Sequence, residues 1–352
     1  MQIRLKTALL LAALLGVGFS SVDTAQAAEN TKSSAQKKHQ AKAPAPKAKA
    51  APVAKKPSHS VQAASKKPAR VASASRVASP QEVRQLAVQS AAALVLDQNA
   101  GDALYQKNAS QVVPIASITK LMTAMVVLDS APSLHTPITI SDDDVDTLRG
   151  SRSRLHVGSV MSRQYALLLA LMSSENRAAH ALARNYPGGM PAFLSAMNIK
   201  AQSLGMRDTH FEDPTGLTSS NVSTANDLAK MVVAAHRYPL IREFTTTSEA
   251  TVDIGGRPMA YHNTNPLVKS AAWDVGLSKT GYINEAGKCL VMQARVADKP
   301  VVIVLLDSVG KQTRVGDANR IKRWMESTQA RAQASSHKPS THATLAGGTP
   351  PG

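Results

Sequence analysis

Runs of apolar residues near both ends of residues 81–335 predict strands. Four such runs are Ala91–Asp97, Ala103–Lys107, Lys288–Val296 and Val301–Leu306. The first run is apolar at nearly every position, which is typical of a strand buried on both faces. Turn-forming residues occupy Asn99-Ala100-Gly101 and the stretch around Asp298-Lys299-Pro300. We therefore expect a hairpin at the first pair and a direct connection within the second.

Other segments have the apolar content and spacing of helices. Helices are predicted over Pro114–Asp129, Ser162–Leu171, Glu175–Arg184, Thr224–Arg237 and, after the last strand, Asp317–Thr328. Thr224 and Asp227 have the spacing of an N-cap and its first-turn acid, and Ser79-Pro80-Gln81-Glu82 has the sequence of another helix start. Strands at both ends with helices between them indicate an α+β fold, in which the terminal strands pair antiparallel in one sheet.

Residues 1–28 have the organisation of a signal peptide. Arg4 and Lys6 precede an uncharged apolar run of 12 residues, Ala8–Phe19, and Ala25-Gln26-Ala27 supplies a small-x-small cleavage site. An uncleaved N-terminal anchor is the alternative, but the run is short for a membrane span and the cleavage site follows at the right distance. The mature chain is therefore expected to be exported to the periplasm.

Residues 29–80 consist mainly of Ala, Lys, Pro and Ser and contain no large apolar residue. Such a segment cannot bury enough surface to offset its ordering entropy, so we expect a disordered linker, and likewise a disordered Ser/Thr/Pro/Gly-rich tail over 336–352. The linker carries a net charge of +11 out of +17, whereas residues 81–335 carry +4. Charge alone suggests nucleic acid, but export argues against it. We expect weak, salt-sensitive attachment of the linker to anionic envelope polymers or membrane surfaces.

The cysteine and histidine content limits the chemistry. The chain has one cysteine, Cys289, which cannot form an internal disulfide or a cysteine-based zinc site. Its place in a predicted strand is typical of a small buried hydrophobic residue. The 10 histidines include no H-E-x-x-H pair. We therefore expect no metal ion and no cofactor.

The first of three short motifs is Ser117-Ile118-Thr119-Lys120, of the form S-x-x-K, early in a predicted buried helix. Residues three apart share one face of a helix. A serine hydroxyl needs a base to become a nucleophile, and a lysine can be that base when burial lowers its pKa. On its own the motif is weak, because S-x-x-K occurs by chance in many helices.

Two further motifs follow along the chain. Ser174-Glu175-Asn176, of the form S-x-N, supplies a hydroxyl and an amide that can relay a proton and bind substrate amides. Lys279-Thr280-Gly281, K-T-G, supplies a positive charge for a carboxylate, a hydroxyl donor and a position without a side chain, where a substrate backbone can approach an edge strand. The three motifs in this order are far more specific than any one of them.

The order S-x-x-K, S-x-N, K-T-G resembles the signature of penicillin-binding proteins and serine β-lactamases. Longer segments resemble the low-molecular-mass D-alanyl-D-alanine peptidases, namely Leu171–Ala179, Asn185–Met190, Asp213–Leu217, His262–Asn265 and Lys279–Tyr282. The resemblance is strongest to the D-alanyl-D-alanine endopeptidase branch and covers residues 85–328. It identifies residues 81–335 as a serine D-Ala-D-Ala peptidase domain.

The resemblance implies a β-lactamase/transpeptidase-like α+β fold, with an antiparallel sheet packed with helices plus an all-helical region. It implies that Ser117 is the nucleophile, Lys120 its base and Ser174 part of the proton relay. The substrate-binding residues would be Asn176, Lys279, Thr280, Gly281 and Tyr282. Backbone N–H groups of Ser117 and Tyr282 would form the oxyanion hole. The implied partners are peptidoglycan stem peptides, with β-lactam antibiotics as covalent inhibitors.

Three other functions are open at this point. A class A β-lactamase needs a glutamate that activates the deacylating water, and no E-x-x-L-N stretch lies between Asn176 and Lys279. A D-alanyl-D-alanine carboxypeptidase, which trims the terminal D-Ala, is the nearer alternative. Many of those proteins have an amphipathic C-terminal anchor, and residues 336–352 show no amphipathic pattern. An inactive wall-binding module would not require an intact Ser117 and Lys120.

Overall fold

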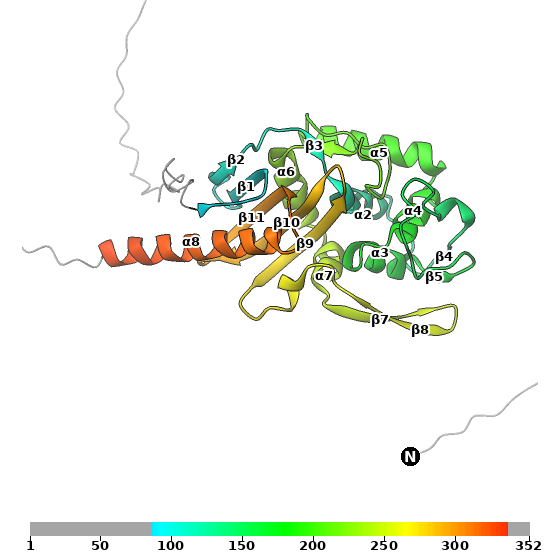
Figure 1. Ribbon diagram of the computed structural model, residues 1–352. Helices are drawn as coiled ribbons and strands as arrows, with labels where there is room; N and C mark the ends of the chain where they lie inside the picture. The colour runs from blue at the N-terminus through cyan, green and yellow to red at the C-terminus, as the bar shows by residue number, and fades with distance from the viewer. Residues whose placement is uncertain (1–85, 337–352) are drawn as a thin grey trace, which may run out of the picture. The chain divides into compact units, whose positions relative to one another are not determined.

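A five-stranded antiparallel sheet forms the centre of the fold in the computed structural model, which describes residues 86–336 (Figure 1). Its strands are β1 (Ala92–Asp97), β2 (Ala103–Lys107), β9 (Asp274–Ile283), β10 (Gly287–Val296) and β11 (Lys299–Ser308). Their order is β2-β1-β11-β10-β9, so β1 lies beside β11, with Ala92 opposite Leu306. The prediction that the two ends of the domain pair antiparallel in one sheet is confirmed, and β9 is an edge strand.

The two faces of this sheet bury different side chains, because successive residues of a strand point to opposite faces. Val304 packs into the core that contains α2 (Lys120–Asp129) and α6 (Ala225–Ala235). Its neighbour Ile303 packs into a second core, on the side covered by α8 (Thr313–Ser336). Figure 1 shows α8 in front of the sheet and α6 behind it. The sheet is therefore a layer between one long helix and the remaining helices.

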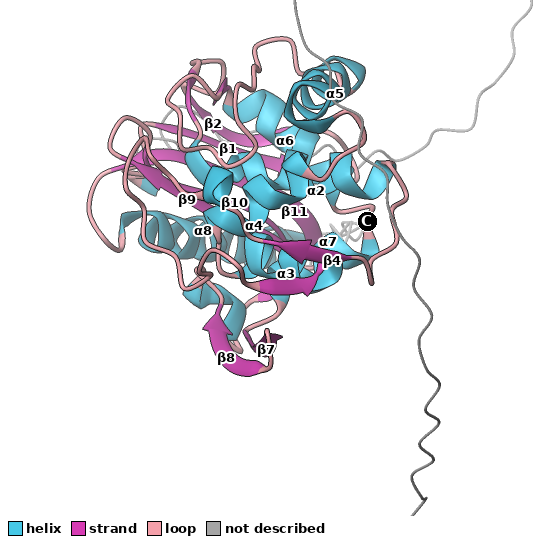
Figure 2. Cartoon of the chain, turned by 90° about the vertical axis from the view of Figure 1, so that its right-hand side faces the viewer, coloured by secondary structure: helices cyan, strands magenta, loops and turns pink. Residues whose placement is uncertain are grey.

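A helical region continues from the α6 side of the sheet (Figure 2). Its other helices are α3 (Arg163–Met172), α4 (Asn176–Arg184), α5 (Gly189–Ser203) and α7 (Pro239–Thr246). Two strand pairs border it, β4 (Pro137–Thr139) with β5 (Val160–Ser162) and the hairpin β7 (Glu249–Ile254) with β8 (Arg257–His262). Shorter elements are β3 (Val113–Pro114), its partner β6 (Val222–Ser223) and the 3-10 turns η1 (Ala116–Thr119), η2 (Asp142–Asp144) and η3 (Pro266–Lys269).

The central helix α2 is surrounded by other helices. Every residue from Lys120 to Val127 is buried, so α2 has no polar face, as expected for a helix inside a core. Side-chain caps fix the starts of two neighbours. Ser162 Oγ accepts a hydrogen bond from Tyr165 N–H at the start of α3, and Thr224 Oγ1 accepts one from Asp227 N–H at the start of α6, as the sequence predicts.

The helix predicted over Pro114–Asp129 differs in its first turn. A 3-10 turn, η1, precedes α2, and Ala116 has a φ of 47°. That left-handed value breaks a continuous α-helix at Ala116. Ser117 consequently lies on a turn at the start of the helix, where its side chain stays partly accessible.

Several elements were not predicted, namely α5, α7, the short pairs β3–β6 and β4–β5, and the β7–β8 hairpin. The last helix begins at Thr313 rather than at Asp317. The predicted signal peptide, linker, helix start at Ser79 and tail beyond Ser336 lie outside the described residues. Within residues 86–336, no helix is both long and apolar enough to cross a membrane.

Candidate active site

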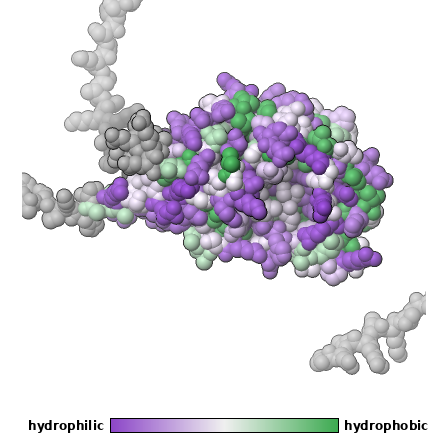
Figure 3. Space-filling view, in the orientation of Figure 1, coloured by the Kyte–Doolittle hydropathy of each residue, from purple (hydrophilic) through white to green (hydrophobic). Residues whose placement is uncertain are grey.

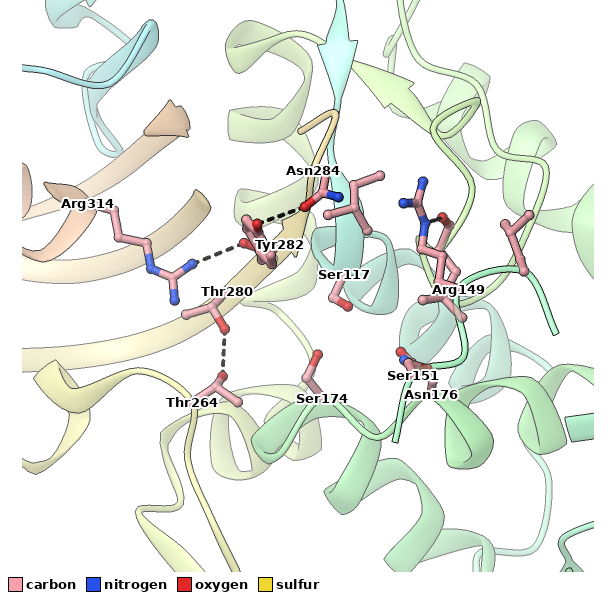
Figure 4. A pocket seen from close by; sticks show the side chains of 14 residues that line it. Ser117, Arg149, Ser151, Ser174, Asn176, Thr264, Thr280, Tyr282, Asn284 and Arg314 are labelled. Atoms are coloured by element: carbon pink, nitrogen blue, oxygen red, sulfur yellow. Dashed lines mark hydrogen bonds between the residues drawn. The ribbon is translucent and has the colours of Figure 1, made fainter. Parts of the chain in front are cut away.

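A cleft of about 610 Å³ lies between the edge strand β9 and the helical region. Six of the eight residues singled out from the sequence line it, namely Ser117, Ser174, Asn176, Thr280, Gly281 and Tyr282 (Figure 4). The other two, Lys120 and Lys279, are buried behind the cleft and are hydrogen-bonded to its serine hydroxyls. The fold thus brings three motifs that are far apart in the sequence into one site.

Lys120 is fully buried and held from three sides. Its Nζ atom lies 2.8 Å from Ser117 Oγ, 2.7 Å from Asn176 Oδ1 and 2.6 Å from the Thr215 carbonyl oxygen. Burial lowers the pKa of Lys120 to about 7, against the opposing effect of nearby carboxylates. At neutral pH a large fraction of Lys120 therefore has the free electron pair that a general base needs.

The turn that carries Ser117 is packed between two glycines from distant parts of the chain. A Cβ atom at Gly216 would lie 1.9 Å from the carbonyl oxygen of Ala116, and one at Gly281 would lie 3.0 Å from the carbonyl oxygen of Ile115 and 3.1 Å from the Ser117 nitrogen. The sequence suggested that Gly281 leaves room for substrate. The structure gives a different reason for this glycine, because β9 packs directly against the turn that carries Ser117.

Lys279 is buried and contacts the second serine. Its Nζ atom donates hydrogen bonds to Ser174 Oγ at 2.9 Å and to the Thr280 carbonyl at 3.0 Å. Burial, with smaller contributions from the Lys120 and Arg314 charges, holds the pKa of Lys279 well below its usual value. Ser174 has a φ of 61°, a conformation that non-glycine residues adopt only when their surroundings impose it. The Ser174 hydroxyl is therefore fixed between the K-T-G strand and the cleft.

Asn176 connects the base to a loop residue that the sequence did not indicate. Its Oδ1 atom accepts from Lys120, and its Nδ2 atom donates to Ser151 Oγ at 2.9 Å. Ser151 is fixed in turn by its N–H, which donates to Asp146 Oδ2 at 2.8 Å. This arrangement sets which end of the Asn176 amide faces Lys120. Ser151 lies outside the three motifs, so only tertiary structure reveals it.

Arg314 is the second residue that sequence reasoning missed. Its Nη1 atom donates to the Gly281 and Cys289 carbonyls, each at 3.0 Å, and its side chain lines the cleft from α8. Beside it, Thr280 Oγ1 donates to Thr264 Oγ1 at 2.7 Å. Lys279 is buried with a depressed pKa, whereas a guanidinium stays charged at neutral pH, so Arg314 supplies positive charge on this side of the cleft.

Two other sequence interpretations concern the rim and the core. Tyr282 is 55% exposed, its hydroxyl donates to Asn284 Oδ1, and the Lys288 ammonium lies 3.9 Å from its ring centroid. Its side chain lines the cleft. Cys289 is fully buried, and burial raises the pKa of its thiol to about 11. A thiol in that state is a packing residue and a poor nucleophile, as its sequence position suggested.

The sequence and fold match known proteins over most of the described residues. The family described as D-alanyl-D-alanine carboxypeptidase, peptidase S11, matches residues 78–310. A D-alanyl-D-alanine endopeptidase of Pseudomonas aeruginosa is 51% identical over 245 residues, which are 69% of this chain and 79% of the relative. The Streptomyces K15 DD-transpeptidase structure has a TM-score of 0.63 and 30% identity, and the match covers 68% of this chain and 98% of that chain.

A second solved structure adds a ligand. Penicillin-binding protein D2 from Listeria monocytogenes, in its ampicillin-bound form, has a TM-score of 0.59 and 29% identity, and the match covers 68% of this chain and 97% of that chain. Together with the K15 structure, it confirms the transpeptidase-like α+β fold that the sequence resemblance implied.

Proposed function

Because the chain belongs to the D-alanyl-D-alanine carboxypeptidase family, peptidase S11, we propose that Ser117 and Lys120 perform the acyl transfer of a peptidoglycan D-alanyl-D-alanine endopeptidase. The reaction cleaves a D-alanyl peptide bond in a cross-link. The observation that carries this assignment is the environment of Lys120 Nζ, which has two carbonyl acceptors and one hydroxyl within hydrogen-bond distance. A neutral amine has two hydrogens for the carbonyls and one electron pair for the Ser117 hydroxyl.

Acylation follows from that geometry. The Ser117 hydroxyl gives its proton to Lys120 Nζ as its oxygen bonds to the D-alanyl carbonyl carbon. The backbone N–H groups of Ser117 and Tyr282 stabilise the negative charge on the carbonyl oxygen. The C–N bond then breaks as the Ser174 hydroxyl, which contacts Lys279, donates its proton to the leaving amine. The proton on Lys120 replaces the one that Ser174 gave up, so Lys120 is neutral again. The acyl group remains as an ester on Ser117.

Deacylation reuses the same base. Lys120 accepts a proton from water, the hydroxide bonds to the ester carbonyl carbon, and the Ser117 oxygen leaves with a proton.

Thr280 and Arg314 lie at the end of the cleft next to the K-T-G strand, where they bind the carboxylate carried by the leaving residue (Figure 4). Asn176 binds substrate amides on the facing wall.

The Listeria relative with bound ampicillin supports a further part of the proposal, that β-lactams acylate Ser117 of this chain. The signal-peptide sequence supports export to the periplasm, where peptidoglycan stem peptides are the substrate. The basic residues of 29–80 support weak electrostatic attachment to envelope polymers or membrane surfaces.

The experiment that tests this assignment is covalent labelling. The full chain is incubated with a fluorescent penicillin, and its intact mass is measured together with that of Ser117→Ala. One adduct on the wild type and none on the variant support the proposal. An unlabelled wild type, or a labelled Ser117→Ala, contradicts it.

A further inference from the structure

An ion pair lies beside the cleft, at the end away from Arg314. Arg149, in the loop between η2 and β5, places its Nη2 atom 2.9 Å from Glu285 Oε2, in the turn between β9 and β10. The Arg149 Nε–H also donates to the Leu217 carbonyl, and its backbone N–H donates to Asp146 Oδ1 at 3.0 Å. The guanidinium is therefore held by the Leu217 carbonyl and Glu285, and the Arg149 backbone is held by its own loop.

The position of Arg149 relative to Ser117 indicates which part of the substrate lies beside it. Figure 4 shows Ser117 between Arg314 on one side and Arg149 on the other. Both arginines line the same cleft. Under the proposed function, the leaving residue lies toward Thr280 and Arg314, so the peptide that acylates Ser117 extends toward Arg149.

We propose that Arg149 binds a carboxylate of the acyl-donor stem peptide, and that this carboxylate replaces Glu285 as its partner. Stem peptides contain acidic residues, and a guanidinium recognises a carboxylate with two parallel hydrogen bonds. The Glu285 side chain is 46% exposed and that of Arg149 is 23% exposed. A solvent-accessible ion pair is weak, so a substrate carboxylate can displace Glu285 at little cost. This inference rests on the proposed function.

The alternative is that the ion pair only fastens the two walls together. The two interpretations predict different effects of removing Glu285 on substrate binding. If the pair is a fastener, removing either partner has the same effect on every substrate. If Arg149 binds the substrate carboxylate, Glu285 competes with the substrate for the same guanidinium. Removing Arg149 then weakens substrate binding, and removing Glu285 strengthens it.

The test compares two cross-linked muropeptide dimers that differ only in the donor stem, whose carboxylates are either free or amidated. We expect wild type to cleave the free form with a kcat/KM about 10- to 100-fold higher. Arg149→Gln should lose that preference, so that its kcat/KM values for the free and amidated dimers become equal. Glu285→Gln should lower the KM for the free form about two- to fivefold. Arg152→Gln is the matched control, because it removes an exposed arginine of the same loop.

The outcomes separate this inference from the proposed function. Fluorescent penicillin contains no donor stem, so its reaction with the wild type tests the proposed function independently of Arg149. A wild type that cleaves both dimers equally overturns the Arg149 subsite while the endopeptidase stands. An equal loss of kcat/KM in Arg149→Gln and Glu285→Gln on both dimers also overturns the Arg149 subsite. That result would show that the ion pair only holds the two segments together. A wild type that neither cleaves dimers nor reacts with penicillin contradicts the proposed function itself.

Discussion

The Nζ atom of Lys120 lies 2.8 Å from the Oγ atom of Ser117, and no part of the Lys120 side chain reaches solvent. Burial disfavours the ammonium form, which lowers the pKa of Lys120 to about 7. The same burial that excludes water from the lysine therefore gives it the protonation state of a general base. This relationship has direct consequences for the pH dependence of acylation.

The first prediction concerns pH. Above pH 7 Lys120 is mostly neutral and can accept the Ser117 proton, whereas below pH 7 it is mostly protonated and cannot. The second-order rate of penicillin acylation should fall about tenfold per pH unit below 7 and level off above it. Stopped-flow labelling between pH 5 and pH 9 measures this. A rate independent of pH, or one that rises only near pH 10, would show that Lys120 is not the base.

A second prediction concerns Ser151 as a positioning residue. Ser151→Ala removes the acceptor of the Asn176 Nδ2–H, so the amide that contacts Lys120 is free to rotate. Acylation should slow about tenfold, the worth of one hydrogen bond. Ser151→Thr keeps the hydroxyl and should restore most of the rate. An unchanged acylation rate in Ser151→Ala, or no recovery of the rate in Ser151→Thr, would show that Ser151 does not position Asn176.

A third prediction concerns the packing of Gly216 against the turn that carries Ser117. Gly216 has a φ of 81°, and a Cβ there would collide with the backbone of Ala116. Gly216→Ala should destabilise the protein by roughly 3 kcal/mol or more and slow acylation. Gly256 has a φ of 82° but an open environment, so Gly256→Ala should cost only about 1–2 kcal/mol. Equal losses for the two variants, measured by urea unfolding, would show that the contact with Ala116 is unimportant.

A fourth prediction concerns the attachment of β1 to the last helix. The fully buried Asp317 carboxylate accepts from Ser90 N–H at 2.7 Å, Ser90 Oγ–H at 2.6 Å and Gln89 N–H at 3.0 Å, and it pairs with Arg320 at 2.7 Å. Asp317→Ala leaves these donors without a partner and should cost roughly 3–5 kcal/mol in unfolding free energy. Asp102 is exposed, and Asp102→Ala should change it by less than about 0.5 kcal/mol.

Much of the fold was predictable because its signals are local. Strands β1 and β11 are nearly uniform apolar runs that lie inside the sheet, and the Thr224 cap follows from two residues three positions apart. The β7–β8 hairpin also has a local signal, the Gly255-Gly256 turn. The first turn of the predicted Pro114–Asp129 helix was wrong, because the left-handed Ala116 is imposed by tertiary packing.

The active-site motifs were predictable because each holds chemically distinctive residues at a fixed spacing. The residues that complete the cleft have no such spacing. Ser151, Arg149 and Arg314 come from a long loop and a helix start, and only the folded chain brings them beside Ser117. Their importance depends on contacts with partners dozens of residues away, which neither composition nor periodicity encodes.

The most direct test of the account is the digestion of purified cross-linked muropeptide dimers by the full-length wild type and Ser117→Ala, with products separated by chromatography and identified by mass. We predict that the wild type converts dimers into monomers and that Ser117→Ala leaves them intact. Survival of the dimers while pentapeptides lose their terminal D-Ala, or cleavage of dimers by Ser117→Ala, would contradict a Ser117-dependent endopeptidase.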